Sequence, residues 1–320
     1  MINQDSAKKN APNGPLVSVI MNAFNAEEFV REALESALKQ TYPNLEIIFW
    51  DNCSTDITAS IVQEYNDPRI QYFLGQRFTS LGEARNLALE KAQGEFLAFL
   101  DCDDVWMPDK IAQQIGLFED PGVGLVYSDS VFFNNSNKTT NCFANRRPYR
   151  GFVFEEILLN YILSMETVIV RKAAIESMSH LFDPRFTAIE EYEFFARVAQ
   201  KWKVDYSPLL LSKWRVHAKS WTWQKQRSFV DEKKIMLADL KNNLELNQKY
   251  ANSLNTFSDQ IEFENAKQFW IEGNGRESRV QLKKVSIWGK RTWLLWIASI
   301  FPHRLIDRFY AFTFKAIRPD

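Results

Sequence analysis

The sequence predicts an α/β fold in which a doubly wound, mixed but mostly parallel sheet is followed by a helical appendage. Two observations support this prediction. Short β-branched apolar runs alternate with segments of helical apolar spacing through the first part of the chain. After about residue 225 the strand-like runs stop and amphipathic segments take over. We therefore expect a disordered leader at 1–14, a sheet domain at 15–225 and a helical region at 226–320.

The first part of the sheet domain alternates between strand and helix. The run LVSVIMNAF at 16–24 is apolar and rich in β-branched residues, as in a strand buried on both faces. In 26–40, apolar residues repeat at helical spacing with charges on the other side, which predicts an amphipathic helix. The pattern then predicts strands at 45–50, 70–74 and 95–100, separated by helices at 57–65 and 80–92. This alternation indicates a parallel sheet.

The rest of the sheet domain carries four further signals. VGLVYSDSVFF at 123–133 reads as a strand, and 163–175 as a strand that enters a helix. A Pro-containing loop then leads to a helix that begins at Glu190. The last signal is LLLSKWRVHAKSWTW at 209–223, which follows a strand-like run and is rich in tryptophan.

Acidic and amide side chains follow several of the predicted strands. In parallel sheets of this kind, ligands bind beyond the carboxyl ends of the strands. Asp101, Asp103 and Asp104 repel one another there, and a divalent cation would relieve the repulsion. Oxygen ligands suit Mg²⁺ or Mn²⁺. The alternative is a helix-capping cluster with solvated charges, because two acids spaced by one residue are a weak signal alone.

Composition limits the classes of function. The 320 residues are 46% hydrophobic and 25% charged, which is typical of a globular protein. A net charge of −1 gives no overall attraction to nucleic acid. Cys53, Cys102 and Cys142 are too few and too scattered for a disulfide framework or a zinc cluster. We expect reduced thiols in a cytoplasmic protein without a signal peptide or membrane span.

Two segments together are far more specific than any single motif. PLVSVIMNAFNAEEFVREALESALKQTYPNLEIIFWDNCSTD at 15–56 and SLGEARNLALEKAQGEFLAFLDCDDVWMPDKI at 80–111 resemble the family-2 glycosyltransferases of GT-A fold. The resemblance covers roughly 15–220 and is strongest over 16–110. It implies that the sheet domain is catalytic and that its ligand is a nucleotide sugar.

The resemblance also implies roles for individual residues. The first-strand loop would hold the nucleotide base, and Asp51 would hydrogen-bond it. Asp101 would face the ribose, and Asp103 would bind the metal ion, Mn²⁺ or Mg²⁺, together with the diphosphate. The nucleotide-binding candidates are Asn22, Ala23, Phe24, Asn25, Asp51, Arg85 and Asp101. Two alternatives stay open: core packing for Phe24 and a surface salt bridge for Arg85.

Two motifs depart from the pattern of the family. Asn22-Ala23-Phe24-Asn25 stands where the family usually has Pro-Thr-Tyr-Asn. Asp51-Asn52-Cys53-Ser54 stands where it usually has Asp-Asp-Gly-Ser, and Cys53 in place of glycine narrows the backbone conformations of that turn. Neither departure removes a metal ligand, but both leave the identity of the base and of the sugar open.

The catalytic base is expected at the start of the helix that begins at Glu190. The family places an acidic pair there, and its second member, here Glu191, is the general base. The alternative is that these glutamates are simply favourable first-turn residues.

The loop after 209 resembles the loop of this family that closes over the diphosphate. Its candidates are Arg215, His217 as a metal ligand or diphosphate donor, Ser220, and Trp221 and Trp223 as an aromatic wall. Weaker candidates that would line the cleft or contact the acceptor are Asp129, Glu166 and Thr167, while Glu190 is a diphosphate or acceptor candidate.

The resemblance implies an inverting glycosyltransferase of hexosyltransferase type. It would move a sugar from a nucleotide-diphosphate sugar, a UDP-sugar by default, to a hydroxyl of a glycan or lipid-linked acceptor of a bacterial-type surface polysaccharide. One alternative is a catalytically silent sugar-nucleotide-binding or scaffold protein of the same fold. A nucleotidyltransferase is a third hypothesis, but the chain lacks a glycine-rich motif with a basic residue near its start.

The last forty residues interleave basic and aromatic side chains. This pattern suits a helix that lies on an anionic membrane surface, so we expect a peripheral protein on the inner face of the cytoplasmic membrane. The alternative is that the helices pack on the catalytic domain or on a second copy in a homodimer. The residues concerned are Lys283, Lys284, Lys290, Arg291, Arg304, Arg308, Lys315 and Arg318 with Trp288, Trp293, Trp296, Phe301, Phe309, Tyr310 and Phe312.

Overall fold

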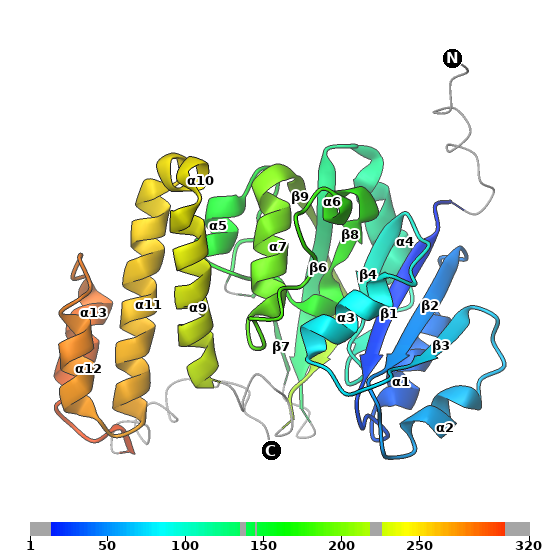
Figure 1. The fold of residues 1–320 in the computed structure, drawn as a ribbon, viewed down its shortest axis with the longest axis horizontal. Coiled ribbons are helices and arrows are strands. Elements are labelled where there is room, and N and C mark those ends of the chain that lie inside the picture. Colours follow the sequence, from blue (N-terminus) through cyan, green and yellow to red (C-terminus); the bar gives the residue numbers. More distant parts are fainter. Residues whose placement is uncertain (1–13, 135–138, 145, 218–225, 305–320) are drawn as a thin grey trace. The chain divides into compact units, whose positions relative to one another are not determined.

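The computed structural model describes residues 14–134, 139–144, 146–217 and 226–304 (Figure 1). The chain divides into two compact units. Of the described residues, one unit comprises 14–134, 139–144, 146–157 and 161–217, and the other comprises 158–160 and 226–304. Nearly all of the predicted leader lies outside the described residues.

Nine strands of the described residues form one mixed sheet in the first unit, with the order β3-β2-β1-β4-β8-β6-β9-β5 and β7 paired to β6. The pairs among β1 to β4 are parallel, as is β6 with β9, whereas β5, β7 and β8 pair antiparallel. The predicted α/β sheet is therefore confirmed. The strands are β1 Val17–Ala23, β2 Leu45–Asp51, β3 Ile70–Leu74, β4 Phe96–Phe99, β5 Val105–Trp106, β6 Val123–Phe133, β7 Thr139–Asn141, β8 Ile169–Arg171 and β9 Lys203–Arg215.

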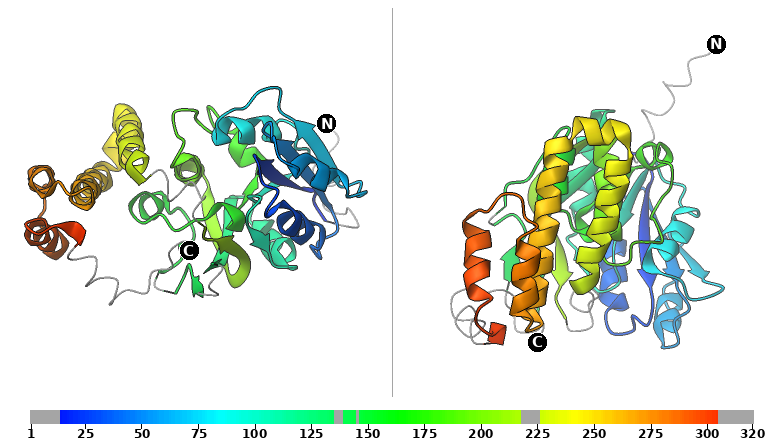
Figure 2. Two further views of the ribbon diagram at one scale, coloured as in Figure 1. Left: turned by 90° about the horizontal axis from the view of Figure 1, so that it is seen from below. Right: turned by 60° about the vertical axis from the view of Figure 1, so that its left-hand side comes forward.

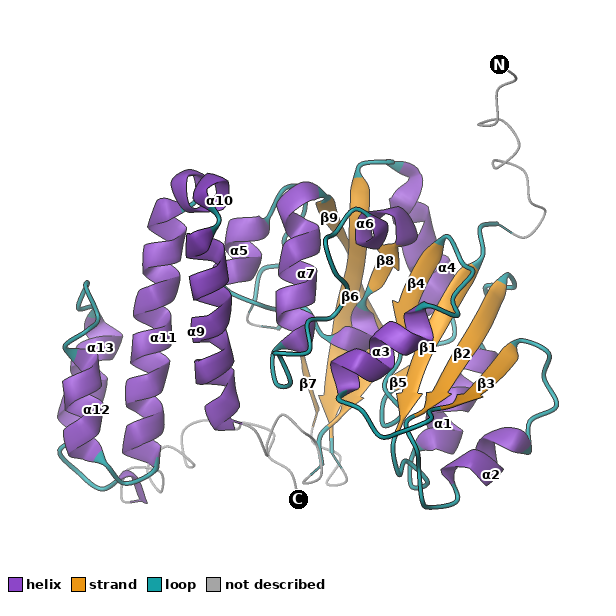
Figure 3. Ribbon diagram, viewed as in Figure 1, coloured by secondary structure: helices purple, strands orange, loops and turns teal. Residues whose placement is uncertain are grey.

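Helices cover both faces of this sheet (Figure 3). On one face α1 and α4 pack against it, and on the other α3 and α7 do so. The helices of this unit are α1 Val30–Leu38, α2 Thr58–Gln63, α3 Leu81–Leu89, α4 Lys110–Ile115, α5 Phe154–Leu159, α6 Lys172–Glu176 and α7 Glu190–Lys201, with short 3₁₀ turns η3 Gly116–Glu119 and η4 Met165–Thr167.

The predicted helix at 26–40 begins later than its apolar pattern suggests. Its first residues form a turn, and α1 starts at Val30. The cause is a set of side-chain acceptors from the next loop. The backbone N–H of Ala26 donates to Thr58 Oγ1 at 2.8 Å, and that of Glu27 donates to Asp56 Oδ2 at 3.0 Å. These bonds hold the loops after β1 and β2 together.

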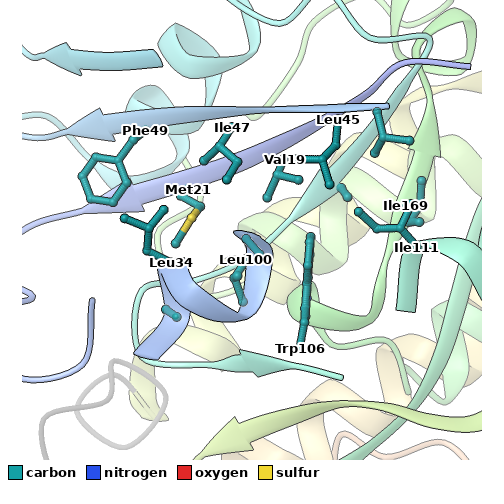
Figure 4. Packing of buried hydrophobic residues seen from close by; sticks show 14 of the residues in the cluster. Val19, Met21, Leu34, Leu45, Ile47, Phe49, Leu100, Trp106, Ile111 and Ile169 are labelled. Atoms are coloured by element: carbon teal, nitrogen blue, oxygen red, sulfur yellow. The ribbon is translucent and has the colours of Figure 1, made fainter. Parts of the chain in front are cut away.

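The main core lies between the sheet and α1 (Figure 4). Alternate residues of β1, Val19 and Met21, point to this face, and Leu34 of α1 packs against them. On the opposite face, Phe99 meets the rings of Phe194 and Phe195 edge-on. Because both faces are buried, β1, β2 and β4 read as continuous apolar runs. Their carboxyl ends are left as the polar edge.

The second unit consists of helices, as expected for this part of the chain. They are α9 Gln226–Asn242, α10 Leu244–Lys249, α11 Ala251–Ile271, α12 Gly275–Leu282 and α13 Lys290–Ala298. Figure 2 shows α12 and α13 side by side. The helices α11, α12 and α13 share a small core that contains Ala266, Trp270, Leu282 and Leu295. None of the described helices has the length and apolar composition that crossing a bilayer requires.

Candidate active site

A buried arginine joins the two acidic motifs that the sequence singled out. Arg85, on α3, donates from one terminal nitrogen to both carboxylate oxygens of Asp101 at 3.0 and 3.2 Å. Its other terminal nitrogen donates to Glu190 at 3.2 Å. Only 3% of the Arg85 side chain is exposed, so the surface salt bridge considered as an alternative is wrong. The acids beyond β4 and the start of α7 thus belong to one site.

Local packing explains how α3 delivers this arginine. Ser80 caps the helix by accepting from the N–H of Glu83. Asn86, the next residue after Arg85, pairs with both the carbonyl and the N–H of Phe182 at 2.8 and 2.9 Å. A methyl group at Gly82 would lie 3.3 Å from Phe182 Cβ, so glycine permits the close approach. The loop before α7 is therefore fixed against α3.

Glu191 follows Glu190 in the first turn of α7 and is partly exposed. Burial of its carboxyl raises its pKa to about 8. The Arg85 guanidinium acts in the opposite direction and lowers the pKa, while Glu190, Asp101 and Glu166 raise it further. A carboxyl poised near neutral pH suits proton transfer. The helix dipole stabilises a glutamate in the first turn of a helix. The position of Glu191 therefore agrees both with a catalytic base and with a purely structural first-turn residue.

Asp103 and His217 lie at the other side of the acidic cluster. Asp103 Oδ2 and His217 Nε2 share a hydrogen bond of 2.9 Å. His217 Nδ1 is buried, and it has no hydrogen-bond partner among the described residues. A carboxylate and an imidazole are ligands that Mn²⁺ accepts. No group of three His, Cys, Asp or Glu side chains in the described part of the chain is placed to hold a metal ion. An ion held by this pair would have to take its remaining ligands from water and a diphosphate.

Arg215 fastens the end of β9 to the acidic motif. Its backbone N–H donates to Asp104 Oδ1, and its side-chain Nε donates to the carbonyl of Asp103, both at 2.9 Å. The guanidinium pairs with Glu32 and lies 4.6 Å from the ring centres of Phe29 and Phe133. Asp104 is 1% exposed, and burial, reinforced by Asp103, raises its pKa. Arg215 thus has a structural task whether or not it also contacts a leaving group.

The loop after β2 uses the side chains that were expected to read the base. Asp51 is fully buried: one oxygen accepts from the N–H of Ser54 and the other from Tyr72 Oη, both at 2.7 Å. Asn25 Oδ1 accepts from the N–H of Thr55 at 2.8 Å. Cys53 has φ of 66°, the left-handed conformation that glycine adopts readily. The turn therefore holds a non-glycine residue in a conformation that costs glycine little.

Two exposed phenylalanines lie beside this loop. The ring centres of Phe24 and Phe78 are 4.5 Å apart, and 49% and 53% of these residues are exposed. Core packing, the alternative considered for Phe24, is therefore wrong. Asn52 holds the loop of Phe78 by accepting from the N–H of Thr79 at 3.2 Å and donating to its carbonyl at 2.9 Å. Sequence reasoning missed Phe78, although an aromatic residue in a polar loop just before EARN is a usable signal.

The other first-loop candidates lie deeper. Asn22 Nδ2 is buried, and none of the described residues accepts a hydrogen bond from it. The carbonyl of Ala23 accepts from the N–H of Asn52 at 2.8 Å. Asn22 therefore offers a free donor at the edge of the site, while Ala23 links β1 to β2.

Comparison with known proteins decides the family. The model of the glycosyl transferase family 2 matches residues 18–175. The glucosyltransferase WfaP of Escherichia coli, named UDP-Glc:alpha-D-GlcNAc-diphosphoundecaprenol beta-1,3-glucosyltransferase, is 30% identical over 222 residues, which are 69% of this chain and 85% of WfaP. This chain belongs to glycosyl transferase family 2. It is accordingly a glycosyltransferase.

Two further relatives of this family-2 enzyme match shorter regions. WfgD of Escherichia coli, with the same activity in its name as WfaP, is 32% identical over 52% of this chain and 64% of WfgD. The putative teichuronic acid biosynthesis glycosyltransferase TuaG of Bacillus subtilis is 32% identical over 49% of this chain and 62% of TuaG. The chain thus spans less than two thirds of the length of either. The name of WfgD states a diphosphoundecaprenol-linked acceptor, and the name of TuaG states a putative role in teichuronic acid biosynthesis.

Solved structures agree on the GT-A fold. TarS of S. aureus superposes with a TM-score of 0.62 at 21% identity, covering 91% of this chain and 82% of the TarS chain. The mannosyltransferase PcManGT of Pyrobaculum calidifontis, in complex with GDP-Man and Mn²⁺, superposes with a TM-score of 0.63 at 18% identity, covering 96% and 89%.

The remaining candidates of this family-2 enzyme fall into two groups. Glu166, 1% exposed, accepts from Ser130 Oγ at 2.8 Å and from Ser164. Asp129 accepts from two backbone N–H groups, and Thr167 is buried. Asp129 and Glu166 thus tie separate segments of this unit together, whereas Thr167 Oγ1 donates to the nearby carbonyl of Ser164 at 2.6 Å. Ser220, Trp221 and Trp223 lie outside the described residues.

Proposed function

We propose that this enzyme transfers a sugar, with inversion, from a UDP-sugar to a hydroxyl of a lipid-linked or glycan acceptor. The names of WfaP and WfgD state a UDP-glucose donor and a diphosphoundecaprenol-linked acceptor, and the structure of TarS has been solved in complex with UDP. The observation that carries the proposal is the Arg85 bridge, because Arg85 pairs with both Asp101 and Glu190 and so brings the two acidic motifs next to each other. A donor-binding motif and a base are then within reach of the same sugar.

The nucleotide would lie over the carboxyl ends of β1, β2 and β4. Phe24 and Phe78 present aromatic faces on which a base can stack. Asn22 contributes a hydrogen-bond donor without a described partner. Asp51 would need to exchange one of its present bonds, to Tyr72 or to Ser54, to contact the base. Asp101, partly exposed, would face the ribose.

Asp103 and His217 would hold Mn²⁺ or Mg²⁺. The ion, when bound, would neutralise the diphosphate of the donor. Breaking the present hydrogen bond between the two side chains frees Oδ2 and Nε2 to face the same point. Arg215 would keep the Asp103 backbone in place through its bond to that carbonyl.

Glu191 is proposed as the general base. Its carboxylate takes the proton from the acceptor hydroxyl, and that oxygen forms a bond to the anomeric carbon as the bond to the nucleoside diphosphate breaks on the opposite face. A single displacement inverts the configuration, so an α-linked donor gives a β-linkage. The β-1,3 products in the names of WfaP and WfgD agree with this stereochemistry for α-linked UDP-glucose.

A panel of nucleotide sugars, each with and without Mn²⁺, tests the proposal by release of nucleoside diphosphate. We expect release with a UDP-sugar and metal, and a β-linked product once an acceptor is supplied. Binding of the donor without release would support the silent protein instead. Release of pyrophosphate in a parallel assay with a nucleoside triphosphate and a sugar 1-phosphate would indicate a nucleotidyltransferase. An α-linked product from an α-linked donor would contradict inversion.

A further inference from the structure

The second unit presents an apolar stripe that its own packing does not use. On α13, Trp293, Leu294 and Ile297 are each more than half exposed. The stripe continues past the helix through Ile300 and Phe301, also more than half exposed. These positions follow helical spacing and so lie on one side of the segment.

The opposite side of α13 already packs against the other helices. Leu295 belongs to the core formed with α11 and α12, and Thr292 and Ser299 are buried. Two polar bonds fix the segment: Arg279 donates to the carbonyl of Ser299 at 2.6 Å, and Trp270 Nε1 donates to the carbonyl of Phe301 at 3.0 Å. The exposed stripe is therefore held outward by a rigid support and is not the packing face of the helix.

Positive charge surrounds the stripe. Residues 278–304 contain six lysines and arginines and no acidic residue, in a chain whose net charge is −1. Lys283, Lys284, Lys290 and Arg291 are exposed, and among the described residues none of the four has an ion-pair partner. Apolar and aromatic side chains rimmed by lysine and arginine match an anionic lipid surface, where the rings enter the interface and the cations meet headgroups.

We propose that α13 and the turn after it, through Phe301, form the surface by which this enzyme binds anionic membranes. A second copy of the chain fits this face poorly, because a self-complementary contact would bring the two sets of cations together. The inference deepens the proposed function, since a lipid-linked acceptor resides in a membrane, but it concerns binding alone.

Sedimentation of the full chain with vesicles tests the inference. We expect binding to vesicles of phosphatidylcholine with phosphatidylglycerol, weakening as salt rises, and little binding to phosphatidylcholine alone. Trp293→Ser with Ile297→Ser should lower the affinity at least roughly tenfold, as should Lys290→Glu with Arg291→Glu. Leu244→Ser, at a leucine that is 83% exposed on α10, is the apolar control. Lys91→Glu with Lys201→Glu, at exposed lysines of the first unit, is the control for net charge.

Several results would overturn the inference. They are equal binding to both vesicles, no binding to either, unchanged binding of the α13 variants, or equal loss in the controls. A change from dimer to monomer on Trp293→Ser, seen by analytical ultracentrifugation, would assign the face to a second copy. Release of nucleoside diphosphate in solution is measured on the same preparations. Failure of the transferase proposal and failure of membrane binding are therefore read separately.

Discussion

Arg85 and Glu190 lie 3.2 Å apart although 105 residues separate them in the sequence. Through this contact the helix that follows β3 holds the helix that carries the proposed base. The same guanidinium binds Asp101, so one buried cation balances acids from two motifs. Removing it would take away the buried positive charge that balances the buried Glu190 and the partly exposed Asp101, and breaking a buried ion pair from one side is costly.

Substituting Arg85 should therefore disturb both stability and the base. Arg85→Gln should lower the stability by about 3–5 kcal/mol, measured by urea unfolding. It should also move the pH profile of transfer to higher pH, since Arg85 lowers the pKa of Glu191. Arg77→Gln is the matched control, because Arg77 makes an exposed pair with Glu83 in the adjoining loop. A purely structural arginine would leave the pH profile where it is.

The Glu191 pKa of about 8 predicts a pH dependence of activity. Only the ionised form accepts a proton, so about a tenth of the enzyme is competent at pH 7. Transfer should rise with pH, reach half of its maximum near pH 8 and level off roughly one pH unit higher. It is followed as nucleoside diphosphate release in buffers of constant ionic strength. Glu191→Gln should abolish transfer while the protein stays folded, and normal turnover in this variant would remove Glu191 from the base role.

The same pKa makes a separate prediction about stability. The folded protein holds the proton of Glu191 more tightly than the unfolded chain does, because the pKa is raised on folding. The contribution of this carboxyl to the free energy of unfolding is therefore fully present below its ordinary pKa of 4.5 and is lost as pH rises to about 8. Glu191→Gln should abolish this pH-dependent loss of stability, because glutamine does not ionise. The melting temperature of the variant, relative to the unchanged protein, should therefore increase from pH 5 to pH 8. A constant difference across that range would show that the carboxyl is solvated.

The proposed metal pair predicts that donor binding depends on both side chains. Asp103→Ala and His217→Ala should each reduce the melting-temperature increase that UDP with Mn²⁺ produces, and EDTA should do the same for the unchanged protein. Asp109→Ala, at an exposed acid just beyond the motif, is the control. An undiminished increase in His217→Ala would leave His217 as a partner of Asp103 only.

The exposed aromatic pair predicts weaker donor binding when Phe78 is lost. Stacking of a base on an aromatic ring contributes about 1–3 kcal/mol. Phe78→Ala should therefore raise the Kd for UDP by roughly five- to 150-fold, measured by calorimetry. Phe152→Ala is the control, since Phe152 is 70% exposed in the same unit. Equal affinities would place the base elsewhere.

The strands and the acidic edge were predictable because both depend on local signals. Apolar runs set the strands, and parallel strands bring their carboxyl ends together, which places Asp101 and Asp103 at the edge. The Arg85–Glu190 contact was not predictable, because it depends on how α3 packs against the loop before α7. The roles of the tryptophans in the last helix were likewise hidden: Trp293 is exposed, whereas Trp296 packs partly against the core. Basic and aromatic spacing alone does not say which side of a helix its neighbours cover.

A buried lysine outside the proposed chemistry gives the last prediction. Lys110 is fully buried on α4, where its ammonium donates to Gln114 at 2.8 Å and lies 4.5 Å from the ring centre of Trp106. Burial lowers its pKa to about 7, and the nearby Glu166 opposes this shift. Below pH 7 Lys110 is charged in both states, but its ammonium is buried in the folded protein and hydrated in the unfolded chain. This charge therefore lowers the free energy of unfolding. Between pH 7 and its ordinary pKa of 10.5, Lys110 is neutral in the folded protein and still charged in the unfolded chain. The destabilisation therefore shrinks as pH approaches 10.5.

Lys110→Met keeps an unbranched side chain, shorter by the terminal nitrogen, and removes the charge. We expect a higher melting temperature than in the unchanged protein at pH 6 to 7, with the gain shrinking toward pH 10 as the unchanged protein becomes more stable. The bond to Gln114 is lost, which offsets part of the gain. Lys39→Met, at an exposed lysine paired with Glu35, should give no such gain. A lower melting temperature for Lys110→Met at every pH would mean that the ammonium stabilises the fold.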